Sequence, residues 1–530
     1  MTLRPLAKPA VRPAVDRLRT ALVALTVRAL PSAPTEAKPP VQRSFVARSA
    51  ALGFVAILSI TWGTSQPSSP FTLKIPGSWF FGIDPVGTHQ NQQGLFLGLV
   101  AVYGGLVLLM RVWWGLARAA RNREISTRDL MWVLALWVLP LIVAPPLFSR
   151  DVYSYAAQGE MMSHGISPYM FGPHVLGSGP YVTPVDPLWM NAPAPYGPLF
   201  LGIDGLLAKV TLHNALATVV ALRLLELVGV ALLAVYIPKL ARTFNRSAGE
   251  SFVLAVLNPV TLLELVGGAH NDALMLGLLV AGVTLARQKK PIAGIVLCAL
   301  GAAIKVPAAL GIVYIGWEWL GTGTPVRDRL RRVASAGALG GVVMGALSMA
   351  TGLGWGWVLN LATPGTVRSW LAPSTGIGMI VSRLVHGIGI GISSATVLSI
   401  TRVVGLAIAA GVGLFLLAHS DRIGALRAMG VTMLLVVVLG PVVQPWYLSW
   451  GLVLLVPVST GWLRKVLIVG SIVSPFIGLP GGRQLIGDLL HANPILAAVS
   501  AVALVTVLTA PLGASLRHAP QTLSSAPARA

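Results

Sequence analysis

Long hydrophobic runs recur along nearly the whole chain, and they constrain its fold more than any other feature. The runs are roughly 15 to 22 residues long, and an α-helix needs ~20 residues to cross a bilayer. Of the 530 residues, 55% are hydrophobic and only 11% are charged. A chain this apolar does not make a soluble domain. The sequence therefore predicts an all-α polytopic integral membrane protein.

The basic residues set the orientation of these runs. The formal net charge is +22, which in a soluble protein would suggest a nucleic-acid partner. Here most Lys and Arg lie in short loops between the runs, as the positive-inside rule describes for cytoplasmic loops. We therefore expect contact with membrane lipid and no nucleic-acid partner. The single cysteine, Cys298, excludes an intrachain disulfide and a cysteine-based metal site.

The first three predicted spans are residues 46–64, 94–116 and 129–147. The loop between the last two carries Arg118, Arg121, Arg123 and Arg128, so it is expected in the cytoplasm. The chain that follows Leu147 is then outside. Residues 1–45 form a basic cytoplasmic tail, whose sequence fits a helix on the inner leaflet and a disordered tail equally well.

Residues 198–212 are apolar but are not expected to cross. If they crossed, the next span, 216–237, would carry the basic residues that follow it (Lys239, Arg242 and Arg246) to the outside. The segment also contains Asp204 and Lys209, each of which would cost roughly 2.5 to 3.5 kcal/mol at the centre of a spanning helix. The sequence therefore predicts a surface or re-entrant helix here.

The rest of the chain alternates between hydrophobic runs and loops, many of them basic. The remaining predicted spans are 251–267, 272–287, 291–305, 306–320, 333–352, 398–418, 427–442, 446–460, 464–479 and 495–512. Together with the earlier runs they predict about fourteen spans, with both termini in the cytoplasm.

Asp151 follows the outer end of the span 129–147, at the start of a polar stretch rich in Pro, Gly and Tyr. Ser149 can cap a helix that ends near Gly165. Asp151 would then lie in the first turn, where the helix dipole and unpaired N–H groups favour a carboxylate. A fixed, ionised carboxylate at the membrane surface suits a general base. A plain helix-start aspartate that pairs with Arg150 explains the local pattern equally well.

Polar residues also interrupt the hydrophobic runs at other predicted outer junctions, and lipid offers such groups no partners. His270, Asn271 and Asp272 can hydrogen-bond a sugar, although a helix cap at a hairpin explains them more simply when they are taken alone. No cysteine or second histidine stands near them, so no metal site is predicted. Lys305 ends another run at the outer face, and snorkelling towards headgroups is its alternative explanation.

A late outer junction contains Gln444, Trp446 and Tyr447, which form either an aromatic belt or a platform on which a sugar stacks. Several arginines on the predicted outer side oppose the positive-inside trend: Arg150, Arg368, Arg383 and Arg402. Because Arg binds phosphate through paired hydrogen bonds, this group suggests a phosphate-bearing lipid ligand. Misplaced span boundaries are the alternative.

The order of these features resembles the GT-C superfamily of glycosyltransferases that use polyprenyl-phosphate sugars. An early span delivers an Asp onto a Tyr-rich external helix, and a short surface helix follows later. The short motifs, in order, are Ala194-Pro195-Tyr196-Gly197-Pro198-Leu199, His270-Asn271-Asp272, Ile304-Lys305 and Gln444-Pro445-Trp446-Tyr447. Within the superfamily the chain looks like the actinobacterial α-1,6-mannosyltransferases of the MptB type, over residues 45–512.

The resemblance implies a GT-C fold and a division of the chain. A core module would occupy residues 129–320 and contain an external catalytic loop, 148–215. The two spans within 46–128 would be an N-terminal addition to the minimal core. A C-terminal membrane region would follow in 321–512, and residues 513–530 would be a disordered cytoplasmic tail.

The resemblance also implies a reaction. The donor would be polyprenyl-phosphate-mannose and the acceptor a lipid-linked mannoside, joined by an α-1,6 linkage of the lipomannan and lipoarabinomannan core, outside the cytoplasmic membrane. Asp151 would be the general base of an inverting displacement. Arg150, Lys305, Arg368 and Arg383 would bind the donor phosphate. Tyr153, Tyr155, His270, Asn271, Asp272, Gln444, Trp446 and Tyr447 would bind substrate. No metal or cofactor is expected, because cations can neutralise a single phosphate.

Two alternatives stay open. An enzyme of the same superfamily would look alike with arabinofuranose or glucose as the transferred sugar. A lipid or solute transporter would also have many spans. The long external loop, 148–197, and the outward position of the polar residues count against a transporter, because transporters keep ionisable groups near the membrane midplane and often contain repeats.

Overall fold

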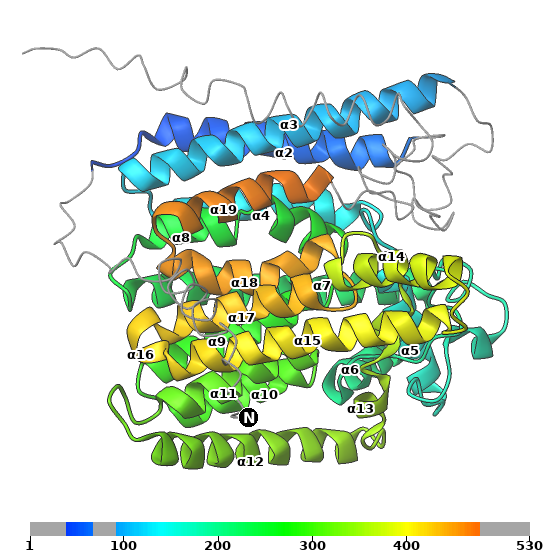
Figure 1. Cartoon of the computed structure of the whole chain (residues 1–530). Coiled ribbons are helices and arrows are strands. Elements are labelled where there is room, and N and C mark those ends of the chain that lie inside the picture. Colours follow the sequence, from blue (N-terminus) through cyan, green and yellow to red (C-terminus); the bar gives the residue numbers. More distant parts are fainter. Residues whose placement is uncertain (1–38, 67–91, 477–530) are drawn as a thin grey trace, which may run out of the picture.

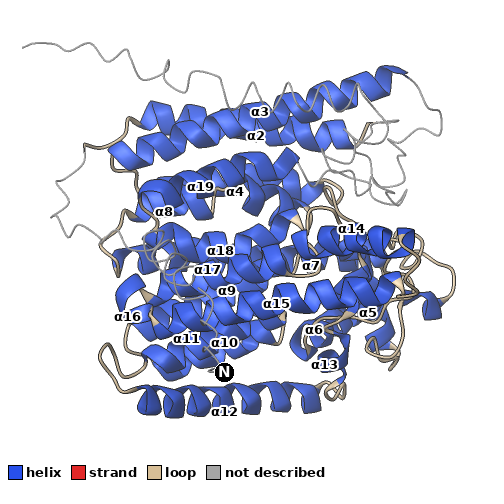
Figure 2. Ribbon diagram, in the orientation of Figure 1, coloured by secondary structure: helices blue, strands red, loops and turns tan. Residues whose placement is uncertain are grey.

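The computed structural model describes residues 39–66 and 92–476, and these parts of the chain are almost entirely helical (Figures 1 and 2). The α-helices are α2 (Arg43–Thr64), α3 (Gln92–Asn122), α4 (Thr127–Val143), α5 (Asp151–Ser163), α6 (Pro198–Val210), α7 (Ala215–Arg242), α8 (Ala248–Ala255), α9 (Asp272–Arg287), α10 (Pro291–Ala302), α11 (Ala309–Glu318), α12 (Val326–Ala350), α13 (Gly356–Asn360), α14 (Pro373–Gly387), α15 (Ser394–Ala418), α16 (Ser420–Ile423), α17 (Ala425–Leu439), α18 (Leu448–Leu455) and α19 (Gly461–Val473). The all-α prediction is confirmed.

Short 3₁₀ and π helices link the α-helices. They are η2 (Pro173–Leu176), η3 (Thr261–Gly267), η4 (Val306–Ala308), η5 (Thr363–Thr366), η6 (Pro445–Tyr447), η7 (Val456–Val458) and η8 (Ser474–Phe476), of which η3 is a π-helix. Within the described ranges the only β pairing is an isolated bridge between Pro40 and Glu124. That bridge ties the start of α2 to the loop between α3 and α4.

Within the part of the chain that the structure describes, five helices are long and apolar enough to cross a membrane: α2, the Phe96–Asn122 part of α3, α7, α12 and α15. In Figure 1 the labelled long helices α2, α3, α12 and α15 lie roughly parallel. Shorter apolar helices such as α10 and α17 complete the bundle. The chain is therefore a polytopic membrane protein. The total of about fourteen spans stays a prediction.

The predicted span 251–267 is broken in the structure. Pro259 follows α8, and the side chain of Asn258 accepts a hydrogen bond from the N–H of Val260 at 2.9 Å, which starts a new turn. The chain then forms the π-helix η3, and η3 and α9 meet at a bend of 116°. Ala269, inside the bend, has a left-handed φ of +52°, which is uncommon without glycine.

Two further interruptions lie close to this bend. Lys305 stands between α10 and η4 with an extended backbone. Gln444 stands before η6, where Pro445 cannot donate a backbone hydrogen bond. Polar side chains from all three interruptions meet in the same region. The interruptions therefore place polar side chains together at a point where continuous apolar helices would present only hydrophobic ones.

Helices α5 and α6 form a layer at one end of the bundle (Figure 1). They pack closely at Gly159, where an added Cβ would come within 2.5 Å of the backbone oxygen of Asp204. Helix α6 has 13 residues and so rises only about 20 Å. As expected for residues 198–212, it is too short to cross.

Residues 353–397, where the sequence predicts no span, contain α13, η5 and α14. Helix α14 packs on α15 through Gly378, whose added Cβ would lie 2.5 Å from Thr401 Oγ1. Its apolar residues alternate with Gly, Ser and Thr, which hides it from a search for continuous hydrophobic runs. The predicted span 495–512, the tail 513–530 and nearly all of 1–45 lie outside the described residues.

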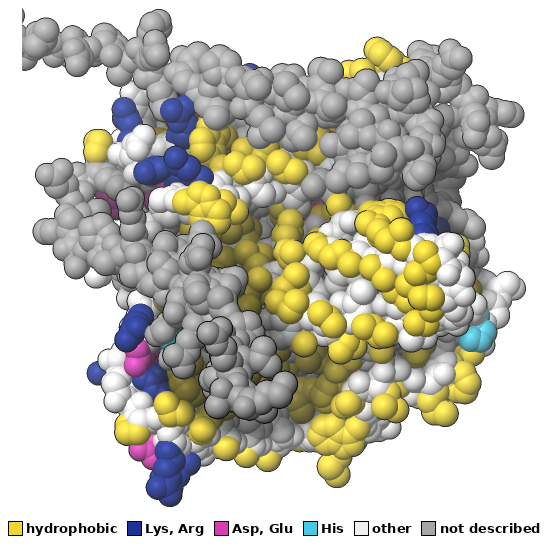
Figure 3. Space-filling view, in the orientation of Figure 1, with side chains coloured by type: hydrophobic (Ala, Val, Ile, Leu, Met, Phe, Trp, Pro, Cys, Tyr) yellow, Lys and Arg dark blue, Asp and Glu magenta, His cyan; other side chains and the backbone are white. Residues whose placement is uncertain are grey.

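Lys and Arg gather at the end of the bundle opposite α5, on the face that Figure 3 shows. The helix α12 begins there, and Arg329 in its first turns binds Asp421 of α16 at 2.7 Å. The arginine-rich loops of the sequence thus come together at one end. The α5 end carries few charges on this face.

Candidate active site

Asp151 is the first residue of α5, at the end of the bundle away from the basic loops. The backbone N–H of Asp151 donates to Ser149 Oγ at 3.2 Å, so Ser149 starts the helix as expected. Phe148 before it has a left-handed φ of +60°, which turns the chain sharply out of α4. The side chain of Asp151 is 16% exposed. Trp189 Nε1 donates to its Oδ1 at 3.0 Å.

His270 lies in the bend between η3 and α9 and faces the same carboxylate. Its Nδ1 lies 2.7 Å from the carbonyl oxygen of Glu264, which can only accept, so Nδ1 carries a proton. Its Nε2 lies 3.8 Å from Asp151 Oδ2. The ring is fully buried and stacks on Trp446 at 3.7 Å between centroids. Burial lowers the pKa of His270, so the ring is neutral and presents the lone pair of Nε2 to Asp151.

Lys305 and Asp272 form a buried ion pair beside this group. Lys305 Nζ lies 2.8 Å from Asp272 Oδ2 and 3.5 Å from Asn271 Oδ1. Trp450 Nε1 donates to the other oxygen of Asp272 at 2.5 Å. Burial disfavours the Lys305 ammonium more than any single contact favours it, but the charge and hydrogen bond of Asp272 together with the charges of Tyr447 and Asp151 outweigh burial and raise the pKa of Lys305. The lysine is therefore a permanent cation near Asp151.

Aromatic side chains enclose the ammonium and line the site. Lys305 Nζ lies 4.7 Å from the ring centroid of Tyr447 and 5.9 Å from that of Tyr196, within reach of a cation–π attraction. Tyr155 meets Tyr196 edge to face at 5.1 Å. Burial raises the pKa of Tyr155 and of Tyr196 well above the usual range. Both phenols therefore stay protonated and remain able to donate hydrogen bonds.

The loop that contains Tyr196 is fixed through its backbone. Gly197 N–H donates to the carbonyl of Ile304 at 3.0 Å, and Leu199 N–H donates to that of Ala303 at 3.1 Å. An added Cβ at Gly197 would lie 2.3 Å from the Ala303 oxygen, so only glycine allows this approach. The motif 194–199 thus docks directly beside Lys305.

Opposing influences act on the Asp151 carboxyl. Burial raises its pKa, while the positive charges of His270 (when protonated) and Lys305 and the N–H of Trp189 lower it. The net shift is upward from the ordinary value of 3.8. A carboxylate with a raised pKa is a stronger base than a solvated aspartate.

Two other predicted site residues, Arg150 and Tyr153, lie beside Asp151 in the chain and contact other groups. The guanidinium of Arg150 donates to the carbonyls of Pro184 and Val185 at 2.8 and 2.6 Å, so it holds the loop between α5 and α6. Tyr153 is buried beside Arg150 and Arg223. A direct contact of Arg150 or Tyr153 with substrate stays a prediction.

Of the predicted phosphate ligands, Arg383 lies in α14 and Arg368 in the loop before it. Both are exposed, and Arg383 lies over the ring of Trp370 at 5.7 Å. Arg402 holds the loop before α14 through the carbonyls of Gly365 and Val367.

Gln444, half-buried, precedes η6, and its backbone carbonyl accepts a hydrogen bond from the N–H of Tyr447. The structure therefore gathers Asp151, Tyr155, His270, Asn271, Asp272, Lys305, Trp446 and Tyr447. Phosphate binding by Arg368 and Arg383 stays a prediction.

Several residues of the site were not predicted from the sequence. Trp189 and Trp450 bind the two acidic side chains. Tyr196, which belongs to the motif 194–199 but was not among the predicted site residues, lies beside the Lys305 ammonium. Arg223 of α7 is fully buried and binds the carbonyls of Ile142, Ala144 and Gly267. It thereby joins the end of α4, which leads to Asp151, to the bend that carries His270. An arginine inside a predicted span was the available signal.

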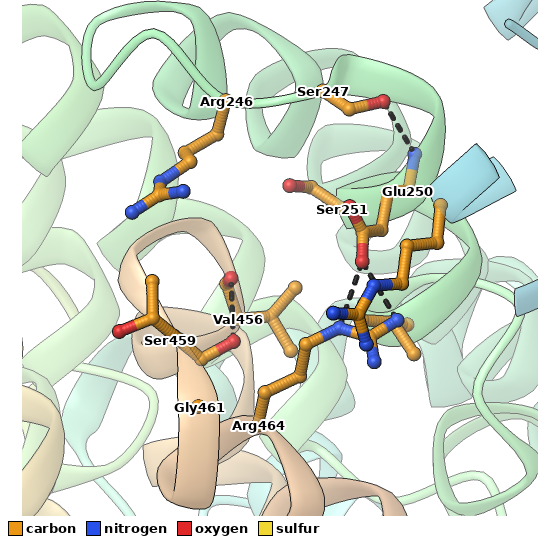
Figure 4. Close-up of a pocket in the computed structure, with 11 residues that line it drawn as sticks. Arg246, Ser247, Glu250, Ser251, Val456, Ser459, Gly461 and Arg464 are labelled. Carbon is orange, nitrogen blue, oxygen red and sulfur yellow. Dashed lines mark hydrogen bonds and ion pairs between the residues drawn. The ribbon is translucent and has the colours of Figure 1, made fainter. Parts of the chain in front are cut away.

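A cavity of about 160 Å³ lies at the other end of the bundle (Figure 4). Its lining includes Arg121, Arg246 and Arg464, and Arg464 binds Glu250 at 2.7 Å. Helix α9 connects the two ends of the bundle. It begins at Asp272, and Arg287 at its other end lies over the ring of Phe244, two positions before Arg246 of the cavity lining. Sixteen residues of helix separate them by about 24 Å. This cavity is therefore not part of the group around Asp151.

A membrane helix bundle that buries a carboxylate, a lysine and a wall of aromatic rings at one end has the parts of a membrane glycosyltransferase. Comparison with known families agrees. Residues 50–321 match the family model described as α-(1→6)-mannopyranosyltransferase, N-terminal domain, and residues 374–510 match the MptB C-terminal domain.

Individual relatives give the same result. The chain is 32% identical to α-(1→6)-mannopyranosyltransferase A of Mycobacterium tuberculosis over 77% of this chain and 80% of the relative. It is 33% identical to a probable α-(1→6)-mannopyranosyltransferase of Mycolicibacterium smegmatis over 75% and 77%. It is 32% identical to α-(1→6)-mannopyranosyltransferase B of Corynebacterium glutamicum over 64% and 60%. No solved structure shows significant similarity.

The chain belongs to the family of α-(1→6)-mannopyranosyltransferases of the MptA and MptB type. The family predicted from the short motifs is thus confirmed, and the protein is a membrane mannosyltransferase.

Proposed function

We propose that the protein transfers mannose from polyprenyl-phosphate-mannose to a lipid-linked mannoside, in α-1,6 linkage and with inversion, at the outer face of the cytoplasmic membrane. The acceptor would be a growing lipomannan or lipoarabinomannan core. The observation that supports this best is the Asp151 carboxylate, partly buried within 3.8 Å of His270 and near the Lys305 ammonium. The family supplies the sugar and the linkage.

In the proposed reaction Asp151 accepts the proton of an acceptor hydroxyl. The hydroxyl oxygen attacks the anomeric carbon, the bond from that carbon to the phosphate oxygen breaks, and polyprenyl phosphate leaves with the bonding electrons. If the donor is β-linked, one displacement yields an α-mannoside, and no second carboxylate is required as a nucleophile. His270 Nε2 is a free acceptor next to Asp151, so it can take the proton onward.

Lys305 is placed to neutralise the leaving phosphate. Two of its donors point at Asp272 and Asn271, and an ammonium has three, so one donor remains for a phosphate oxygen. The pair with Asp272 fixes the ammonium in place, which favours a pre-organised site. The exposed Arg368 and Arg383 would attract the lipid phosphate before it enters.

The orientation follows from the charges. Lys and Arg collect at the end opposite α5, and that end is expected in the cytoplasm. The group around Asp151 would then lie on the outer face, with both termini inside. Tyr155, Tyr196, Trp446 and Tyr447 offer faces and hydroxyls of the kind that contact a sugar ring.

The experiment that tests the proposal is mannose transfer in detergent from labelled polyprenyl-phosphate-mannose to a lipid-linked mannoside. We compare the wild type with Asp151→Asn and with the control Asp129→Asn, an acidic residue in the first turn of α4. Loss of a positioned base is expected to lower turnover by about 10²- to 10⁴-fold. The control should keep its rate, and donor binding should persist in Asp151→Asn.

Each outcome is informative. Normal transfer by Asp151→Asn would reject the carboxylate as base while keeping the enzyme. Absence of transfer in the folded wild type would reject the mannosyl donor, and polyprenyl-phosphate-arabinofuranose and polyprenyl-phosphate-glucose would then be tried. Product NMR distinguishes α from β linkage and thereby tests inversion.

A further inference from the structure

Three metal-ligand side chains converge at the far end of α5 from Asp151. His164 Nε2 lies 3.0 Å from Glu160 Oε1, and His213 Nδ1 lies 2.9 Å from Glu160 Oε2. The ligand atoms of the three residues all lie within 4.8 Å of one another. Glu160 and His164 are four residues apart and share one face of α5, whereas His213 comes from the loop between α6 and α7.

The backbone around His213 holds its ring in this position. Leu212 and His213 both have left-handed φ angles, +54° and +59°, and a non-glycine residue in this region carries a steric cost. Asn214 caps α7 by accepting from Ala217 N–H at 2.9 Å, which fixes the other side of the loop. The rings of His164 and His213 stack at 5.4 Å with an interplanar angle of 27°. The loop is therefore built to point an imidazole at Glu160.

We propose that Glu160, His164 and His213 bind one Zn²⁺ ion. Two imidazoles and one carboxylate are a donor set that zinc uses when it keeps an open fourth position for water. Neighbouring ligands of a tetrahedral zinc lie about 3.3 Å apart, given bonds of about 2.0 Å. The N···O distances of 2.9 to 3.1 Å need to open by a few tenths of an ångström, and the two histidine nitrogens, which lie within 4.8 Å of each other, need to reach the same separation by rotation of the two exposed rings.

The surroundings suit an ion that enters from solvent. The side chain of Glu160 is 11% exposed, while those of His164 and His213 are 55% and 47% exposed. The Glu160 carboxylate therefore lies in the protein interior, and the two imidazoles lie between it and the solvent. Solvent reaches the cluster between them and can supply the fourth ligand.

The geometry gives the ion a structural role. Nine residues of α5 separate Glu160 from Asp151, about 14 Å along the helix, so the ion does not touch the reacting carboxylate. It would join the C-terminal end of α5 to the loop before α7. Helix α5 would then be fixed at both ends, by Trp189 at Asp151 and by the ion at Glu160. This differs from the expectation of no metal, which considered only the donor phosphate and the surroundings of His270. His213 stands 53 positions from Glu160, so no local pattern joins the three ligands.

The test measures bound metal directly. The protein is purified through a tag without histidine, stripped with EDTA, dialysed against a slight excess of Zn²⁺ and then against metal-free buffer. Elemental analysis should find close to one zinc per chain. The variant His164→Gln/His213→Gln should retain less than a tenth of that. The control His174→Gln, an exposed histidine of the same external region that bonds Met190, should match the wild type.

A second measurement keeps the proposal falsifiable if the double variant folds poorly. Zn²⁺ should raise the thermal unfolding midpoint of the stripped wild type and of His174→Gln, because a ligand that binds the folded state stabilises it. The single variant His164→Gln, altered at the most exposed of the three residues, should show little increase. The proposal would be overturned if the wild type bound no zinc and its unfolding midpoint did not change when Zn²⁺ was added. It would also be overturned if the double variant bound as much zinc as the wild type. Neither result depends on the transfer assay.

Discussion

The basicity of Asp151 depends on contacts with individual residues. Burial raises its pKa, and the Trp189 N–H at 3.0 Å works in the opposite direction because it stabilises the ionised form. Trp189 is only half-buried, so a change there should not harm the core. Removing the indole N–H should therefore change the pKa of Asp151 without disturbing the rest of the fold.

Replacing Trp189 by Phe keeps the ring and removes the hydrogen bond. The pKa of Asp151 should rise further, and a base is lost as pH falls through its pKa. The acid limb of the kcat/KM profile should therefore move to higher pH, with a rate at high pH within about 10-fold of the wild type. The control is Trp462→Phe, an exposed tryptophan of α19. An unchanged acid limb would separate Trp189 from the titration of Asp151.

Sequence patterns could identify some of these residues and not others. Asp151, His270 and Lys305 are visible because each is an ionisable group at the end of a hydrophobic run. Trp189 and Trp450 look like ordinary interface aromatics, and their partners stand 38 and 178 positions away. No local pattern encodes such contacts. The folded chain alone shows that these two indoles bind the acidic groups.

The bend between η3 and α9 shapes the site at the scale of the element. Gly268 lies in it with an ordinary helical φ of −76°, so its role is not conformational. An added Cβ would lie 2.6 Å from His270 Cε1. The lack of a side chain at this position is what lets the imidazole lie against the bend and face Asp151.

Gly268→Ala should therefore displace His270 and lower transfer by about 10-fold or more, since small misplacements at a reacting group have large effects. Membrane extraction and unfolding temperature should change little. Gly341→Ala is the matched control, because nothing lies within 4 Å of an added Cβ on that face of α12. Equal activity of the two variants would mean that the position of His270 does not matter for catalysis.

The sequence was a good guide to long helices and a poor one to short ones. Helices α2, α7 and α15 agree with predicted spans, because about twenty apolar residues leave few options in a membrane. The π-helix and the break at Asn258 were missed, because a run that is apolar on all sides gives no signal of where its backbone changes course. Helix α14 was missed because small polar residues dilute its hydrophobicity.

The distribution of charge over the whole molecule predicts its orientation. Ser178 lies in the loop between α5 and α6 and Thr322 in the loop between α11 and α12, and both are exposed. In intact cells a membrane-impermeant maleimide should label Ser178→Cys but not Thr322→Cys, and permeabilised cells should show both labelled. Cys298 is fully buried, so the wild type serves as the unlabelled control. Labelling of Thr322→Cys in intact cells would reverse the proposed orientation.

The π-helix η3 has a consequence for how this chain can vary. In an α-helix each residue advances the direction of the side chains by about 100°. A π-helix accommodates the backbone of one extra residue per turn. Deleting a single residue from Thr261–Gly267 would let the segment wind as a regular α-helix while His270 keeps its direction towards Asp151, because the π turn holds that extra residue. The same deletion in a regular α-helix would rotate every residue that follows by about 100°. This stretch can therefore take up a change in chain length that the neighbouring helices cannot.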